Sequence, residues 1–158
     1  MSKLFLLCFL FTGYSILTSF SFSPSADFKS LQLVDSLELD RKKYMDQVLL
    51  TIKGKEKMAV DSVFTNLKVL SGFPAENLVF AMNAWGKALG VSCGHCHNTS
   101  DFALDEIDKK EIAREMVSLG TLISDKLKTI KGLSARPIVN CTTCHRGTLK
   151  PEFRFPAK

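Results

Sequence analysis

The chain has 158 residues, which is enough for one domain once a leader segment has been removed. Its formal net charge of +5 comes from 21 basic and 16 acidic residues. This surplus is too small to indicate a partner such as nucleic acid, so we expect no nucleic-acid binding.

The first 22 residues read as a signal sequence, numbered 1–22 with an uncertain cleavage point. Lys3 supplies a short positive start, an apolar run follows, and the small residues Ser19 and Ser21 suit a cleavage site. Polar interruptions of the run favour cleavage over the alternative, an N-terminal membrane anchor. The mature protein is expected in the periplasm or otherwise outside the cytoplasmic membrane, and cleavage would remove Cys8.

Residues 23–70 are expected to form a helical lead-in to the rest of the chain. The Ser-rich stretch 23–37 reads as a loose connection. Apolar residues at helical spacing then predict one helix over 39–52 and a second over 58–70. The basic run 41–43 is expected on a solvated helix end, and a docking patch for an acidic redox partner is the alternative.

A further helix is predicted over residues 74–89. Pro74 suits its first position and Gly90 suits the position just past its end. Met82 lies on the apolar side of this helix, 11 residues before Cys93. A methionine there is either an ordinary core residue or a thioether ligand to a metal.

The helix leads directly into the motif Cys-x-x-Cys-His, made of Cys93, Cys96 and His97. This spacing is the attachment motif of c-type haem. The two thiols lie about one turn apart and add to the two vinyl groups of one porphyrin. The histidine that follows is placed to bind the iron as its proximal ligand.

The next predicted helix covers residues 105–131, where apolar side chains again recur at helical spacing. Met116 lies within it, 25 residues before the second cysteine pair begins at Cys141. Gly132 and Pro137 mark the end of this helix.

A second copy of the motif consists of Cys141, Cys144 and His145, so the sequence predicts two covalently attached haem c groups. A zinc site is the first alternative, but 44 residues separate Cys96 from Cys141, whereas a four-cysteine zinc ribbon closes about 15–20. A disulfide framework or a thiol-redox pair is the second alternative, and neither explains the two histidines.

These elements form a crude repeat of helix, turn and Cys-x-x-Cys-His. We therefore predict an all-α fold in which helix-turn-CxxCH units pack around two haem groups that supply much of the core. The dihaem domain would cover residues 23–158, with a first haem unit over 71–101 and a second over 102–158.

Several further segments carry a more specific resemblance. They are residues 66–70, 73–75, the helix of Met82, 89–98, 101–103, 113–116 and 141–147 with 150–151. Together they resemble the cytochrome c subunit of photosynthetic reaction centres, over roughly residues 60–155. The subunit of that family is a tetrahaem protein built of helix-turn-haem units, and this chain is similar to its C-terminal pair.

The resemblance implies that Met82 is the axial ligand of the first haem iron. It implies no local partner for the second haem, because the family takes that distal histidine from the half that is missing here. Met116 is then the best local candidate, and plain core packing or an open or partner-supplied site are the alternatives. Arg114 and Arg146 are candidate partners of the haem propionates, unless they are simply solvent-exposed.

The sequence therefore predicts an exported dihaem c-type cytochrome, an electron-transfer protein that passes single electrons between redox donor and acceptor proteins. It predicts no catalytic residue and no enzyme activity. A haem peroxidase-like enzyme with an open second iron is one alternative function. A fixed redox relay inside a membrane electron-transfer complex is the other.

Overall fold

The computed structural model describes residues 26–133 and 137–151. Within these two ranges the chain is helical, and the β-pairing is limited to isolated bridges. The predicted all-α fold class is thus confirmed for this part of the chain. The predicted signal sequence, residues 1–22, lies outside the described residues.

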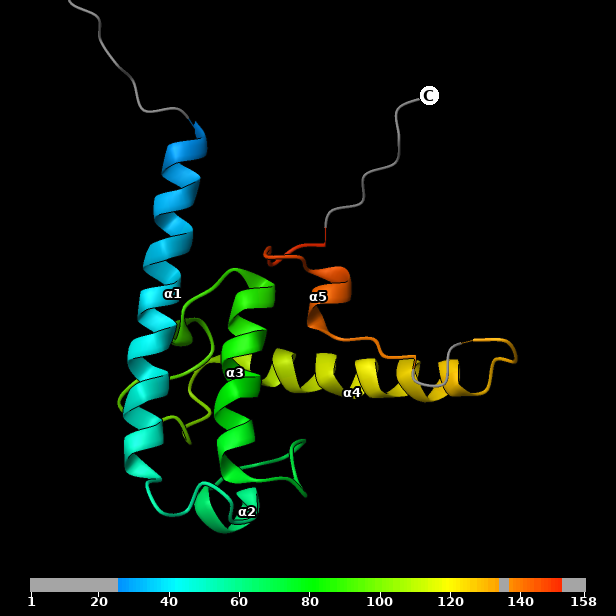
Figure 1. Cartoon of the computed structure of the whole chain (residues 1–158), viewed down its shortest axis with the longest axis horizontal. Coiled ribbons are helices and arrows are strands. Elements are labelled where there is room, and N and C mark those ends of the chain that lie inside the picture. Colours follow the sequence, from blue (N-terminus) through cyan, green and yellow to red (C-terminus); the bar gives the residue numbers. More distant parts are fainter. Residues whose placement is uncertain (1–25, 134–136, 152–158) are drawn as a thin grey trace, which may run out of the picture.

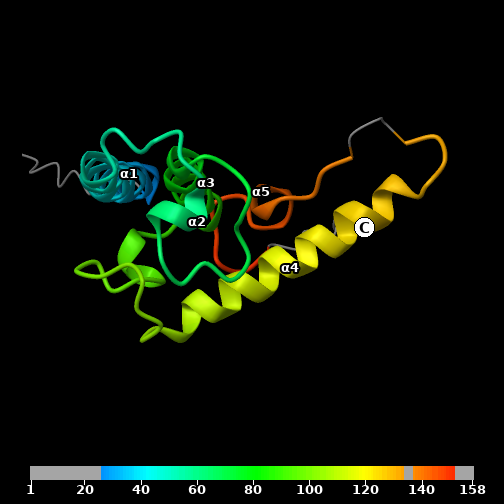
Figure 2. The ribbon, with the colours of Figure 1, turned by 90° about the horizontal axis from the view of Figure 1, so that it is seen from below.

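The described elements are α1 (Ala26–Thr51), α2 (Val60–Val63), α3 (Ala75–Leu89), the short 3₁₀ helix η1 (Cys93–His95), α4 (Asp108–Lys128) and α5 (Cys141–Cys144). The helices α1 and α3 lie side by side, while α4 extends away from this pair (Figure 1). The short helix α5 lies against α3, and the view from below shows it between α3 and α4 (Figure 2).

The first helix is longer than the sequence led us to expect. Residues 26–37 were predicted to be a loose connection, and this is wrong, because they form the first half of α1. The stretch contains no glycine or proline that would stop a helix. Its side chains gain little burial, since Leu31 and Leu33 are each 60% exposed.

The helix predicted over residues 58–70 is also wrong in its extent, because only α2 forms there. Phe64 is already extended, with φ −113° and ψ 152°, and Asn66 adopts a left-handed φ of 58°. Val63 and Phe64 pack against the core in this conformation. Tertiary packing therefore overrides the helical spacing of the apolar residues in this segment.

The hydrophobic core lies where the end of α1 meets the start of α3, next to α2. Ile52, Ala75 and Val79 are buried in it, and Val48 is among the half-buried side chains that pack around them. Because the C-terminal end of α1 meets the N-terminal end of α3, the two helices run antiparallel. The middle of α1 consequently faces the C-terminal end of α3, where the first cysteine motif begins.

The helices predicted on either side of the first motif are confirmed with small shifts at their ends. Pro74 precedes α3 with φ −62°, and Gly90 caps its C-terminus in a left-handed conformation with φ 65°. The helix predicted over 105–131 is the shorter α4, which ends at Lys128.

Candidate haem-attachment site

The first motif folds into a single tight turn. The N–H groups of Cys96 and His97 both donate to Cys93 O, at 3.3 and 3.2 Å. A three-residue step in a 3₁₀ turn places the two side chains one above the other, so both thiols lie on the same side. Burial raises the pKa of both cysteines, and the carboxylate of Asp40 raises that of Cys93 further. Both thiols are therefore protonated at neutral pH.

The imidazole of His97 is held in one tautomer by the main chain. Its Nδ1 lies 3.2 Å from Phe102 O, and because a carbonyl can only accept, Nδ1 must carry the proton. The Nε2 atom is then the unprotonated nitrogen that can bind a metal. Burial lowers the pKa of His97, which keeps the ring neutral.

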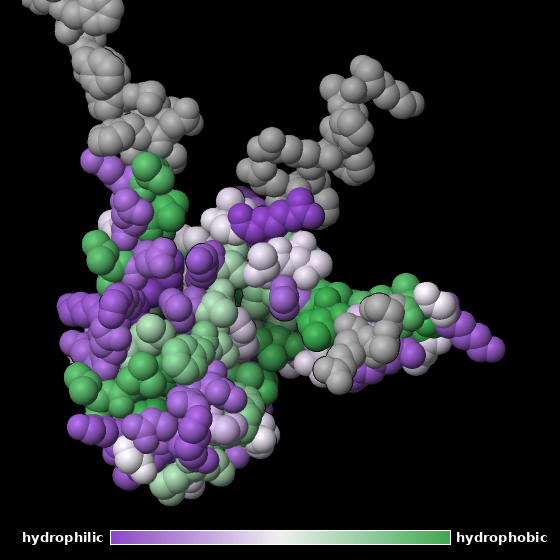
Figure 3. All heavy atoms as spheres, in the orientation of Figure 1, coloured by the Kyte–Doolittle hydropathy of each residue, from purple (hydrophilic) through white to green (hydrophobic). Residues whose placement is uncertain are grey.

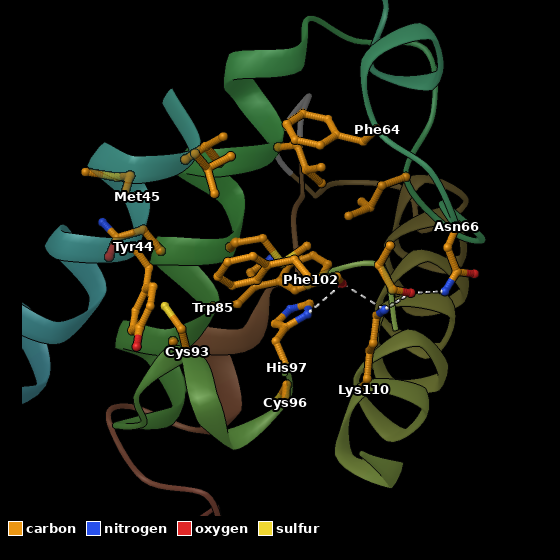
Figure 4. A pocket seen from close by; sticks show the side chains of 18 of the residues that line it. Tyr44, Met45, Phe64, Asn66, Trp85, Cys93, Cys96, His97, Phe102 and Lys110 are labelled. Atoms are coloured by element: carbon orange, nitrogen blue, oxygen red, sulfur yellow. Dashed lines mark hydrogen bonds between the residues drawn. The ribbon is translucent and has the colours of Figure 1, made fainter. Parts of the chain in front are cut away.

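Residues that the sequence assigned to the first haem line one common cavity of about 640 Å³ (Figure 4). Met82, Cys93, Cys96 and His97 are all among its lining residues. Its other walls are largely aromatic and aliphatic, with Tyr44, Phe64, Leu67, Leu78, Trp85 and Phe102 among them. The volume falls within the range of about 300–1,000 Å³ that is typical of small-molecule and cofactor sites.

Two consecutive residues of α1 hold the chain just before and at the first motif, and the sequence analysis missed both. Asp40 Oδ2 accepts from the N–H of Cys93 at 3.3 Å, and Arg41 Nη1 donates to Val91 O at 2.9 Å. Arg41 is only 4% exposed, so its expected position on a solvated helix end is wrong. Its spacing of seven residues to the cavity-lining Val48 is a helical signal that could have revealed it.

A buried ammonium organises the loop that follows the first motif. Lys110, which is 9% exposed, donates from Nζ to the carbonyls of Phe102, Ala103 and Leu104 at 3.0, 2.9 and 2.8 Å. Phe102 O therefore accepts from both Lys110 and His97, as Figure 4 shows. The buried amine fixes the acceptor that orients the imidazole.

The second motif is a single helical turn with its own cap. Asn140 Oδ1 accepts from the N–H of Thr143, and Thr143 Oγ1 accepts from the N–H of Asn140, both at 3.2 Å. This reciprocal capping satisfies two free donors at the start of α5. The imidazole of His145 repeats the arrangement of His97, because its Nδ1 lies 3.1 Å from Thr148 O. Its Nε2 is again the nitrogen left for a metal.

The second motif rests on the end of α3. Gly147 N–H donates to Ala88 O at 2.7 Å. The approach is so close that a Cβ atom on Gly90 would lie 2.0 Å from Gly147 O. The two motifs are thereby brought together at one end of one helix.

An exposed apolar stripe on α4 lies near the second motif. Ile112, Met116, Leu119 and Ile123 recur at helical spacing and are 52, 44, 47 and 39% exposed. Hydrophobic side chains of α4 gather below α5 in Figure 3. The residues leading into α5 contact the same helix, because the N–H of Val139 donates to Ser124 Oγ at 3.3 Å. Met116 is not among the residues that line the first cavity.

The disulfide and zinc alternatives for the cysteines find no support in residues 26–133 and 137–151. Cys93, Cys96, Cys141 and Cys144 are all free thiols there. No three residues of the types His, Cys, Asp and Glu gather within these ranges in a way that could hold a metal ion. Neither a disulfide framework nor a zinc site is formed by this part of the chain.

The residues present fit an iron porphyrin. The first cavity combines apolar walls with two thiols on one turn and an imidazole whose Nε2 is free. It also contains a buried cationic side chain, Arg41, whose Nε atom has no hydrogen-bond partner among the described residues. At the second motif, a paired-thiol turn and an oriented imidazole lie near an exposed apolar helix face, which a flat apolar macrocycle would cover.

A helical fold with two such turns is typical of c-type cytochromes. The sequence model of the family described as photosynthetic reaction centre cytochrome C subunit matches residues 29–155, and the chain belongs to this family. The family predicted from the sequence segments is thus confirmed.

Two curated proteins are similar to this chain. The photosynthetic reaction center cytochrome c subunit of Roseobacter denitrificans is 30% identical over 105 residues, which are 63% of this chain and 28% of that protein. Cytochrome c-554 of Chloroflexus aurantiacus is 33% identical over 91 residues, 51% of this chain and 20% of that protein. The chain therefore matches less than a third of the length of either relative.

None of the helices in the described ranges combines the length and the apolar character needed to cross a membrane. The only segment for which the sequence suggested an anchor, residues 1–22, falls outside those ranges.

Proposed function

We propose that this chain is an exported dihaem c-type cytochrome that passes single electrons between redox proteins. One observation carries the proposal. Each Cys-x-x-Cys turn is followed by a histidine whose Nδ1 bonds a main-chain carbonyl, Phe102 O in one case and Thr148 O in the other. This is the arrangement that orients a histidine to bind iron through Nε2, and it occurs twice.

The residues of each unit have separable roles in this proposal. Cys93 and Cys96 tether the first haem through thioether bonds and His97 ligates its iron, while Cys141, Cys144 and His145 do the same for the second. When bound, haem supplies an iron that gains and loses one electron without any bond being made in a substrate. The apolar walls of the first cavity exclude water and so favour the less charged ferrous state.

Met82 is the proposed sixth ligand of the first iron. Its support is that it lines the same cavity as Cys93, Cys96 and His97, and that it projects from α3, the helix that leads into the motif. Met116 is the corresponding proposal for the second iron, supported by its place on the exposed apolar stripe of α4.

The proposed partners are protein donors and acceptors of electrons. The relative from Roseobacter denitrificans carries the name of a reaction center subunit, which supports a membrane electron-transfer complex as one of them. Covalent haem attachment takes place outside the cytoplasmic membrane, and the predicted signal sequence is consistent with that location.

Counting the attached haem groups tests the proposal directly. We expect the mature protein from its native host to carry two haem groups by intact mass, and Cys93→Ala to lose or weaken the attachment of one of them. His95→Ala is the matched control, since it alters the same turn but no thiol and no proposed ligand. A mature protein whose mass equals that of the bare polypeptide would refute the proposal.

Replacing Met82 tests the proposed ligand. We expect Met82→Ala to lower the midpoint potential of the first haem by on the order of 0.1 V, because loss of a thioether ligand stabilises the ferric iron. The ferrous variant should also bind carbon monoxide. Met45→Ala is the control, because Met45 lines the same cavity and packs against the core but is not a proposed ligand. Equal potentials in both variants would reduce Met82 to a packing residue.

Carbon monoxide also separates electron transfer from peroxidase-like chemistry. The ferrous wild-type protein should bind little of it if both irons carry two protein ligands. Strong binding at the second haem would support the open-iron alternative instead.

A further inference from the structure

Arg41 is a buried cation that forms no ion pair with the residues that the structure describes. It is 4% exposed, and the hydrogen bond found for it is the one from Nη1 to Val91 O, at 2.9 Å. Its Nε atom is buried and lacks a partner among the described residues. The neighbouring carboxylate of Asp40 accepts instead from the N–H of Cys93.

The other buried basic residues differ from Arg41 in this respect. Arg114 is 7% exposed, and its guanidinium donates to Asp105 at 2.9 Å and to Glu111 at 2.6 Å. Lys110 donates to three carbonyls and pairs with Asp105 at 2.9 Å. These two side chains are already satisfied, so neither needs an anion from outside the chain.

The absence of a side chain at Gly86 in α3 makes room for the Arg41 side chain. A Cβ atom on Gly86 would lie 2.8 Å from Arg41 Cδ and 3.3 Å from Val91 O. Because Gly86 has no side chain, the stem of Arg41 can pass across the helix, and Val91 O can hold one end of the guanidinium. The Arg41 side chain therefore packs in a defined position, between Gly86 and Val91 O.

In this position Arg41 faces the candidate haem site. Arg41 lines the same cavity as Cys93, Cys96 and His97, on the wall formed by α1. A buried guanidinium without an anion is unfavourable, because desolvation of its charge is not compensated by the protein. A haem group carries carboxylates, its two propionates, which are suited to charge-assisted bonds with a guanidinium.

We infer that Arg41 binds a propionate of the first haem, and that α1 is therefore part of the haem site. The inference rests on the proposed function, since it requires haem at the first motif. A negative propionate near the iron stabilises the ferric state, and a neighbouring guanidinium cancels part of this effect. Arg41 should consequently raise the midpoint potential of the first haem.

The test uses the holoprotein, with its haem content measured first by intact mass. We expect Arg41→Met to make reduction of the first haem about tenfold less favourable, which corresponds to about 59 mV for one electron. The propionate bending band in the resonance Raman spectrum should shift as well. Arg41→Lys keeps the charge and should restore part of the potential.

Lys42→Met is the matched control, because it removes the same charge from the same helix at a side chain that is 64% exposed. It should leave both the potential and the Raman band nearly unchanged. Gly86→Ala is the second variant, since it displaces the guanidinium without deleting it, and it should shift both readings in the same direction as Arg41→Met.

The outcomes separate the two proposals. Two attached haem groups, with a potential and Raman band that respond to Arg41 no more than to Lys42, would overturn this inference and leave the proposed function intact. Wild-type protein without haem would overturn the proposed function itself. If Arg41→Met fails to fold, Gly86→Ala with an unchanged potential and band also overturns the inference.

Discussion

The two motif histidines, His97 and His145, make the same kind of hydrogen bond from Nδ1 to a main-chain carbonyl, but the carbonyl lies at a different distance along the chain in each case. The carbonyl that accepts from His97 Nδ1 belongs to Phe102, five residues later, whereas His145 uses Thr148, three residues later. The first carbonyl also accepts from the ammonium of Lys110. A carbonyl shared with a cation is a weaker acceptor for the imidazole, so the two histidines should differ in basicity and, in the proposed haem protein, should donate unequally to the two irons.

Lys110 should contribute measurably to the stability of the loop that follows the first motif. We expect Lys110→Met to lower the free energy of unfolding by about 2–3 kcal/mol, because three carbonyls lose a charged donor. Urea unfolding of the holoprotein measures this. Lys109→Met is the control, as the neighbouring lysine is exposed. Similar stability of the two variants would mean that the loop at Phe102 is held by other contacts.

Among the described elements, α3 is the one that leads into the first cysteine motif and also contacts the second. Its N-terminal end lies in the hydrophobic core, and its C-terminal end accepts the second motif through the bond from Gly147 N–H to Ala88 O. The close approach of the two segments depends on Gly90, which has no Cβ and adopts a left-handed φ of 65°. The spacing of the two cysteine motifs is thereby set by the backbone at the end of one helix.

Gly90→Ala should therefore disrupt the contact between the units. A left-handed alanine alone costs about 1–2 kcal/mol, and the clash with Gly147 O should bring the loss of stability above that range. Gly54→Ala is the matched control, because Gly54 has φ 83° but no atoms within 4 Å of its would-be Cβ. Thermal unfolding of both variants separates the cost of a left-handed alanine from the additional cost of the clash with Gly147 O. Equal losses would show that the second motif can move away without cost.

In the whole molecule, the protein contributes a small core and relies on charged contacts elsewhere. The buried hydrophobic residues lie mainly between α1, α2 and α3. By contrast, the start of α4 is held largely by charged contacts around Asp105, which pairs with Lys68 of the segment after α2 and with Lys110 and Arg114 of α4, at 3.0, 2.9 and 2.9 Å. The apolar stripe of α4 is exposed, as expected for a surface that the proposed second haem would cover.

This network should make the stability of the protein fall in acid. The hydrogen bonds from Arg114 and Lys110 hold the pKa of Asp105 far below its usual range. A carboxylate with a lowered folded-state pKa stabilises the fold fully above its unfolded pKa of about 4, and the effect is lost as the pH falls below that value.

Asp105→Asn is expected to be less stable than the wild type at pH 7, and this difference should shrink as the pH is lowered from about 4 towards 2. Urea unfolding at constant ionic strength measures it. Glu115→Gln, which changes an exposed carboxylate on the same helix, should show little pH-dependent difference. A constant difference in the free energy of unfolding between Asp105→Asn and wild type across this pH range would contradict the role of the network.

The sequence alone determined the features that depend on local order along the chain. The spacing of Cys93, Cys96 and His97 predicts an attachment turn wherever it lies, because the thiols and the imidazole are neighbours in the backbone. The helix α3 could be predicted for the same reason, since Pro74 and Gly90 mark its ends by their own backbone preferences.

Features that depend on contacts between residues distant in the sequence were decided only by the tertiary structure. Arg41 looked like a solvated residue until Gly86 and Val91, on another segment, were seen to enclose it. The stretch after α2 had helical spacing but is drawn out of a helix by packing of Phe64 against the core. The physical reason is that burial and ion pairing come from contacts across the fold, which no local pattern of residues can specify.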